Sequence, residues 1–185
     1  AEDADSEGVE GKFYLWTEEE IRNKALMAPC GLYCGACGVY IATRDGNEKF
    51  REILGKLYGT KPEDTSCDGC MRQDPQKKLY AFCRTCRIRD CALSRGYYSC
   101  HQCAQWPCDA VEGFIVPTGT RVMKRAIPIW RERVAALGDE EGSAAWARSE
   151  CERYSCPFCG APLFRGAQRC RSCKEPVADK LDGSL

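Results

Sequence analysis

Twelve of the sixteen cysteines in this 185-residue chain fall into Cys-x-x-Cys pairs. A Cys-x-x-Cys turn brings two thiolates together at the spacing of metal ligands, and secreted disulfide frameworks rarely repeat it. The pairs are Cys34/Cys37, Cys67/Cys70, Cys83/Cys86, Cys100/Cys103, Cys156/Cys159 and Cys170/Cys173, and the remaining cysteines are Cys30, Cys91, Cys108 and Cys151. The sequence therefore predicts a chain that folds around metal ions.

The last two pairs form the clearest unit. Cys156-Pro-Phe-Cys159 and Cys170-Arg-Ser-Cys173 are separated by ten residues, and Gly160 follows the first pair where the backbone must turn back. This spacing predicts a zinc ribbon of short β-hairpins with one tetrahedral four-cysteine site. Four protein thiolates leave no coordination position open, so we expect this zinc to be structural.

Two further groups of cysteines leave alternatives open. Cys67/Cys70 and Cys83/Cys86 repeat the ribbon spacing with twelve residues between them, but the cysteines from Cys91 to Cys108 follow closely and could interleave as ligands. Cys30, Cys34 and Cys37 fit a zinc site completed by a cysteine between Cys91 and Cys108. They also fit a [4Fe–4S] site with one open iron, as in radical S-adenosylmethionine enzymes. We favour zinc, because no βα repeats could build the barrel of such enzymes.

Fifteen cysteines are thus predicted metal ligands, which corresponds to three or four zinc ions per chain and a colourless protein. They are Cys30, Cys34, Cys37, Cys67, Cys70, Cys83, Cys86, Cys91, Cys100, Cys103, Cys108, Cys156, Cys159, Cys170 and Cys173. His101, the single histidine, lies inside a Cys-x-x-Cys pair and is predicted to be an exposed spacer. Cys151 is predicted to be a partly buried free thiol on a helix.

The remaining pattern indicates a small, mainly α-helical protein with irregular, metal-stabilised cysteine knuckles. Four parts are expected: an acidic arm and leading helix (1–27), a cysteine-rich metal-binding domain (28–116), a helical connector (117–153) and the ribbon (154–178).

Local signals give the expected helix boundaries. Thr17 and Glu20 form a capping box that should start a helix reaching about Met27. Helical spacing predicts one or two helices in 39–58 that end at Gly59, and little regular structure is expected in 60–108. A helix over 121–137 should be kinked or restarted at Pro128, and Asp139 should cap the last helix. Trp130, Val134 and Trp146 are expected to dock the ribbon onto the cysteine-rich body.

Composition excludes several classes of function. No apolar run approaches the ~20 residues of a membrane span, and no signal peptide is visible, so a cytoplasmic protein is expected. The chain has one histidine and no glycine-rich loop ending in Lys-Ser/Thr, which argues against acid–base catalysis and nucleotide binding. The formal net charge is zero, although residues 151–178 carry five basic and two acidic side chains.

The stretch Ala28-Pro29-Cys30-Gly31-Leu32-Tyr33-Cys34-Gly35-Ala36-Cys37 resembles the opening of an uncharacterised, cysteine-rich prokaryotic family known as a domain of unknown function. The similarity continues through Cys67-x-Gly69-Cys70, Cys83-x-x-Cys86-x-Ile88-Arg89-x-Cys91-Ala92, Cys100-x-x-Cys103 and Trp106-Pro107-Cys108. It spans 28–116 and implies a metal-binding, cytoplasmic protein without an established reaction. Residues 1–20 resemble a segment of spermatogenesis-associated-type thioredoxin-domain proteins, without a redox cysteine.

These observations predict a zinc-stabilised, non-catalytic adaptor that binds a protein partner. One alternative is an iron–sulfur electron-transfer or cofactor protein that uses Cys30, Cys34 and Cys37. The other is a nucleic-acid-binding protein that uses its basic ribbon.

Overall fold

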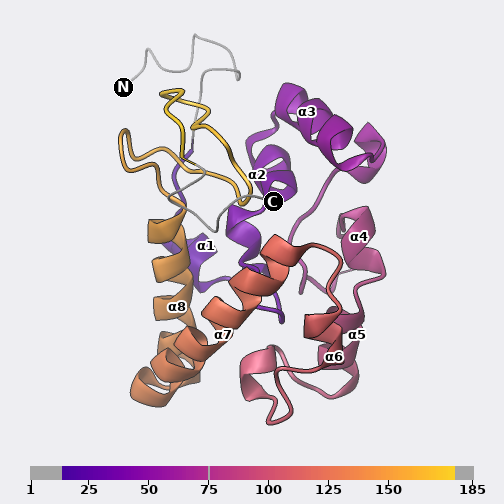
Figure 1. The fold of residues 1–185 in the computed structure, drawn as a ribbon, viewed down its shortest axis with the longest axis vertical. Helices are drawn as coiled ribbons and strands as arrows, with labels where there is room; N and C mark the ends of the chain where they lie inside the picture. Colours follow the sequence, from indigo (N-terminus) through magenta and orange to yellow (C-terminus); the bar gives the residue numbers. More distant parts are fainter. Residues whose placement is uncertain (1–13, 75, 178–185) are drawn as a thin grey trace.

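The computed structural model describes residues 14–74 and 76–177. The described chain is mainly helical, as predicted (Figure 1). Its helices are α1 (Glu18–Arg22), α2 (Gly38–Asp45), α3 (Glu48–Tyr58), α4 (Ala81–Arg84), α5 (Arg87–Ser94), α6 (Asp109–Glu112), α7 (Pro117–Leu137) and α8 (Asp139–Arg153). Short 3₁₀ turns are η3 (Lys24–Leu26), η4 (Cys34–Ala36), η5 (Pro62–Asp64) and η6 (Cys100–Gln102). The predicted acidic arm up to residue 12 and the tail after 177 lie outside the described residues.

The leading helix begins as predicted and ends early. The Thr17 hydroxyl accepts a hydrogen bond from the Glu20 N–H, and the Glu20 carboxylate accepts one from the Thr17 N–H, which completes the capping box. The helix stops at Arg22 because Asn23 is extended and its side chain accepts from the Ala25 N–H, which starts η3 instead. The expected helix to Met27 is therefore two short helical segments.

Two helices occupy the segment 39–58, and they end where the sequence indicates. Gly46 (φ 62°) and Gly59 (φ 70°) close α2 and α3 in the left-handed conformation, and the Asn47 side chain caps α3 through the Phe50 N–H. The segment 60–108 is more regular than expected. Helix α5 begins directly after Cys86, so that Cys-x-x-Cys pair leads into a helix.

Helices α7 and α8 form an antiparallel hairpin that runs along one side of the molecule (Figure 1). Two local expectations concern this hairpin. Helix α7 continues through Pro128, so the expected restart is wrong, while the expected kink stays a prediction; the proline removes one backbone hydrogen bond and the buried face of the helix remains packed. Asp139 is the first residue of α8 and Gly138 is its N-cap, so the Asp139 carboxylate meets the helix dipole without capping.

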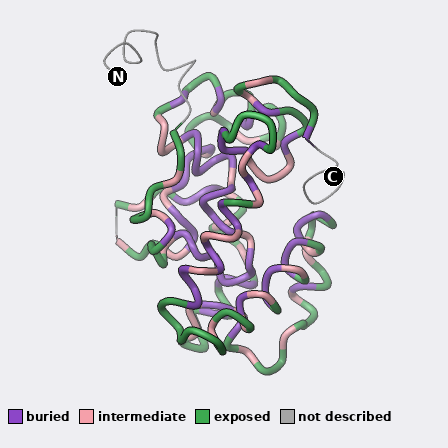
Figure 2. The backbone as a smooth tube through the Cα atoms, turned by 90° about the vertical axis from the view of Figure 1, so that its left-hand side faces the viewer, coloured by how far each residue is buried: buried purple, intermediate pink, exposed green. Residues whose placement is uncertain are grey.

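The centre of the hairpin is an aromatic stack. The Trp130 and Trp146 rings are parallel, with centroids 3.9 Å apart, and the His101 ring covers the other face of Trp130 at 4.7 Å. The Trp130 indole N–H donates to the Ser143 hydroxyl at 2.8 Å. Both tryptophans are buried, as expected, and Figure 2 shows buried backbone along this part of the molecule. They join α7 and α8 to each other and to η6.

No β-strand occurs in 14–74 or 76–177, so the predicted short β-hairpins of the ribbon are wrong. The terminal segment has two isolated antiparallel bridges instead, Ser155 with Pro162 and Arg169 with Pro176. One residue of each bridge is a proline, which has no N–H to extend a ladder. In the described part of the chain, no helix combines the length and apolar character needed to span a bilayer.

Substituting Gly142 should separate the two long helices. A Cβ at this position would lie 2.5 Å from the Val134 Cα and 2.6 Å from the Arg133 carbonyl oxygen, both backbone atoms. We expect Gly142→Ala to lower the free energy of unfolding by about 1–3 kcal/mol, the usual cost of overpacking. Urea unfolding measures this, with the exposed Glu140→Ala in the same helix as control. A Gly142→Ala protein as stable as the wild type would contradict the close approach.

Candidate metal centres

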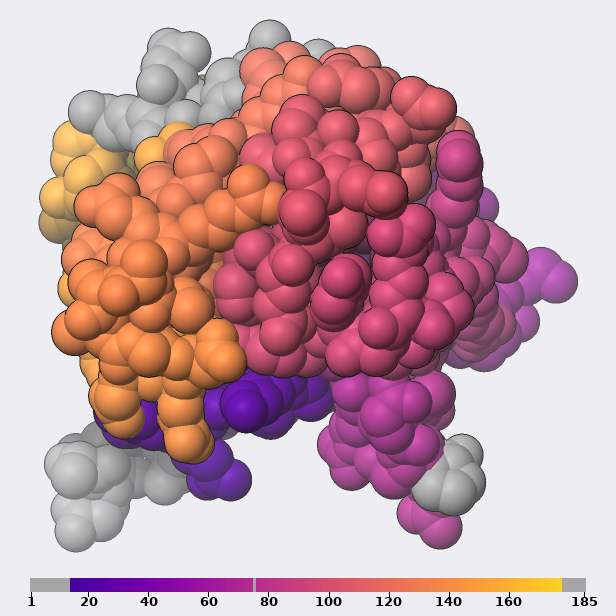
Figure 3. All heavy atoms as spheres, turned by 90° about the horizontal axis from the view of Figure 1, so that it is seen from below, coloured from indigo at the N-terminus to yellow at the C-terminus, as the bar shows by residue number. Residues whose placement is uncertain are grey.

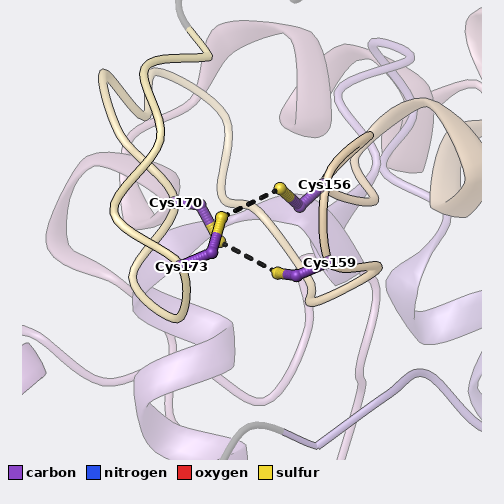
Figure 4. Close-up of side chains that lie close together, drawn as sticks. All are labelled: Cys156, Cys159, Cys170 and Cys173. Carbon is purple, nitrogen blue, oxygen red and sulfur yellow. Dashed lines mark hydrogen bonds between the residues drawn. The ribbon is translucent and has the colours of Figure 1, made fainter.

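Four sulfur atoms converge in the terminal module (Figure 4). The Sγ atoms of Cys156, Cys159, Cys170 and Cys173 all lie within 4.8 Å of one another. The Cys156–Cys173 and Cys159–Cys170 Sγ–Sγ distances are 3.7 and 3.6 Å. Zinc–sulfur bonds of about 2.3 Å in a tetrahedron place sulfurs about 3.8 Å apart. The arrangement therefore fits one tetrahedral metal ion, with every position filled by protein.

The backbone turns twice in the same way to build this site. The Gly160 N–H donates to the Cys156 carbonyl at 2.8 Å, and the Lys174 N–H donates to the Cys170 carbonyl at 3.0 Å. Both residues are left-handed, with φ of 77° and 67°. The Gly160 turn was predicted from the sequence. The Lys174 turn was not predicted, because no glycine marks its position.

The thiols of the module differ in their pKa values. The Ala161 N–H donates to the Cys159 sulfur and lowers the pKa of that thiol to about 7. Burial raises the pKa of Cys170. A cation that binds here would displace the remaining thiol protons, so its affinity should fall in acid.

The terminal module docks on the first cysteine knuckle and on α3. The Arg165 N–H donates to the Ala36 carbonyl at 2.7 Å, and the Arg165 guanidinium donates to the Tyr33 carbonyl at 3.0 Å. The Arg171 guanidinium lies 4.0 Å from the centroid of the Phe50 ring. These contacts come from the loop after Cys159 and from the second knuckle. The sequence had not predicted these contacts, and docking through Trp130, Val134 and Trp146 stays a prediction.

Removing the Arg165 side chain should loosen this docking without emptying the metal site. A hydrogen bond from a charged donor contributes about 1.5–3 kcal/mol, and Arg165→Ala loses the one to Tyr33. We expect faster limited proteolysis of residues 154–177 and an unchanged zinc content. Arg169→Ala is the charge-matched control, since Arg169 is exposed and donates within its own module to Lys174. Equal proteolysis of both variants would contradict the docking role.

A second group of thiols lies in the core of the cysteine-rich segment. The Cys70 N–H donates to the Cys34 sulfur at 3.4 Å, and the Cys70 thiol also interacts with Cys83. The Cys70 thiol lowers the pKa values of Cys34 and Cys83, and both of these thiols raise the pKa of Cys70. The positive charge of Arg165 acts on Cys30, Cys34 and Cys37.

The thiols nearest to Cys34 in this group are Cys70 and Cys83, which come from the segment 67–86. A ligand between Cys91 and Cys108 for the first knuckle stays a prediction. Within the described residues, the terminal module holds the one set of three or more ligand atoms that all lie within 4.8 Å. Cys30, Cys34 and Cys37 therefore do not close a compact site by themselves.

A third group lines a small cavity next to η6. Cys91, Cys100, Cys103 and Cys108 all face this cavity. Burial, together with the nearby charges of Cys108, Cys103 and Cys91, raises the pKa of Cys100 to about 12. Seen from below in Figure 3, the rose-coloured chain around residue 100 forms the centre of the face, beside the orange start of α8.

His101 and Cys151 lie outside these three groups, and the structure tests the burial that the sequence predicted for each. His101 is buried, at 8% exposure, so the predicted exposed spacer is wrong. Its ring stacks on Trp130, which lies far along the sequence and gives no local signal. Cys151 is a buried thiol, as predicted, and burial raises its pKa to about 11.

A family model described as "Protein of unknown function (DUF3795)" matches residues 26–113. The matched segment contains the second group of thiols (Cys34, Cys70 and Cys83) and the third group (Cys91, Cys100, Cys103 and Cys108). It ends before the terminal four-cysteine module. It is consistent with the resemblance to an uncharacterised family. Comparisons with curated proteins and with solved structures gave no match. The thioredoxin-type resemblance of residues 1–20 stays a prediction.

Proposed function

We propose that this protein is a zinc-stabilised, non-catalytic adaptor that binds a protein partner. The observation that carries the proposal is the convergence of Cys156, Cys159, Cys170 and Cys173 within 4.8 Å. A tetrahedral set of four thiolates favours zinc among the common cellular cations. Because all four ligands come from the protein, no position remains for water or substrate, and the metal serves the fold.

The environment of the single histidine supports a non-catalytic role. A general base must reach the proton that it removes. His101 is buried between Tyr98 and Trp130, and burial lowers the pKa of its imidazole. This side chain is thus used as an aromatic packing element.

The basic residues of the terminal module support a protein partner over a nucleic acid. Phosphate binding requires cations that face solvent along one surface. Arg165 bonds to Tyr33 and Arg171 covers Phe50, so two of the four basic residues of the module face the body of the protein. In contrast, Ile115 is 90% exposed and Val116 is 41% exposed just before α7, which offers apolar contact area to a partner.

A reducing compartment such as the cytoplasm fits the cysteine chemistry. All sixteen cysteines are free thiols, and thiols of this kind persist where glutathione and thioredoxin keep them reduced.

The adaptor role is tested by quantitative pull-down with the wild type and with Ile115→Asp. We expect the partner retained by the wild type to bind at least tenfold more weakly to Ile115→Asp, because a carboxylate is desolvated in the apolar contact. Leu57→Asp, an exposed apolar residue on α3, is the matched control. Retention of a nucleic acid that weakens steeply with salt would support the alternative function.

A further inference from the structure

The cavity beside η6 is built by one continuous stretch of chain. Cys91 lies on α5, Cys100 is the first residue of η6 and Cys103 its C-cap, and Cys108 is the N-cap of α6. A capping box between Ser99 and Gln102 stabilises the η6 turn. The four thiols are therefore positioned by local structure and do not depend on the terminal module.

The four sulfurs are farther apart than zinc ligands. In the described residues, no three of them lie within 4.8 Å of one another, whereas the terminal module meets that limit with all four. The centre of a water-sized sphere can move through about 30 Å³ of the space between them. A single zinc ion would draw all four sulfurs to about 3.8 Å and close this space.

The cavity is lined by thiols and mainly apolar side chains. Ile88, Ala92, Trp106 and Ala110 form its apolar walls, Arg95 and Tyr97 also line it, and none of the described residues that line it carries a carboxylate or an imidazole. Four soft thiolates without oxygen or nitrogen ligands bind either zinc or iron–sulfur clusters. A cluster is larger than one ion and takes one thiolate at each of several irons, so its cysteines stand farther apart.

We propose that Cys91, Cys100, Cys103 and Cys108 bind one [4Fe–4S] cluster, separately from the zinc of the terminal module. The wide separation of the four sulfurs around a shared apolar cavity carries this assignment. Every iron receives a protein thiolate, so the cluster is closed and differs from an open site at Cys30, Cys34 and Cys37. Colour is then expected, in contrast to the colourless protein predicted from the sequence.

The test uses the full chain, purified without oxygen and loaded with equal amounts of ferrous and ferric iron and with sulfide, which together supply the two ferrous and two ferric ions of the cluster. We expect visible charge-transfer absorption, with about four irons and four sulfides per chain, as the cluster formula requires. Cys108→Ala should lose this absorption and the bound iron completely and should keep the zinc of the terminal module. Cys151→Ala, which removes a thiol outside all groups, should keep both metals. Cys34→Ala should retain its colour.

Three results would overturn the assignment. The first is a wild-type protein that stays colourless after iron and sulfide loading and holds zinc at these four cysteines. The second is colour that survives in Cys108→Ala, and the third is colour lost in Cys34→Ala alone. If circular dichroism shows that Cys108→Ala is unfolded, the assignment is tested instead by the rate at which an alkylating reagent modifies these four thiols in the wild type. The four thiols should react at least tenfold faster after iron is removed, and equal rates with and without iron would refute the cluster.

Discussion

Cys170→Ser is expected to abolish zinc binding by the terminal module and to unfold residues 154–177. Zinc contributes about 10–16 kcal/mol to the folding of small four-ligand modules, far more than the packing of this segment can supply. Its buried apolar side chains are few and mostly small, Ala161, Leu163, Ala167 and Val177 among them. Cys170 is itself fully buried among the ligands, so a serine there leaves three thiolates around a weak hydroxyl.

Metal analysis should show that Cys170→Ser holds one zinc per chain fewer than the wild type, and limited proteolysis should show rapid cleavage after Arg153. Cys151→Ser is the matched control, because Cys151 is a buried thiol that lies outside the four-sulfur group. It should keep its zinc and its resistance to protease. Unchanged zinc content and unchanged proteolysis in Cys170→Ser would refute the site.

Trp130→Ala is expected to lower the free energy of unfolding by about 3–5 kcal/mol, the range for removing a large buried aromatic side chain. Trp130 has no exposed surface, and its ring lies between Trp146 and His101. The substitution leaves a cavity where α7, α8 and η6 meet, and it removes the indole donor of the Ser143 hydroxyl.

Urea unfolding of Trp130→Ala beside Glu132→Ala measures this effect. Glu132 is exposed on the same helix, so its substitution should change stability by less than about 0.5 kcal/mol. Native fluorescence of the wild type should show shielded tryptophans. A solvent-exposed emission from Trp130, or a stability loss below about 1 kcal/mol, would contradict the stack.

The sequence predicted the features whose causes are local. The capping box of Thr17 and Glu20 requires only residues three apart, and the left-handed Gly59 directly ends α3. The terminal site could be predicted for the same reason, since each Cys-x-x-Cys turn is self-contained and a short loop brings the two together. The division of the chain into four parts stays a prediction.

The features that the sequence could not give depend on contacts between distant segments. Cys34 meets Cys70 because the chain folds back over many residues, and spacing alone does not encode that choice. His101 is buried by Trp130 for the same reason. The β-hairpins were overestimated because Pro162 and Pro176 occupy the bridge positions, which limits each ladder to an isolated bridge.

Native mass spectrometry of the anaerobically purified wild-type chain tests the central claim most directly, namely that thiolate–metal bonds hold this protein together. The account predicts a folded species heavier than the 20.7 kDa polypeptide by at least one zinc ion. Acid or chelator should remove the metal and shift the charge-state distribution toward that of an unfolded chain. A compact species with the mass of the metal-free polypeptide, unchanged by chelator, would contradict the account.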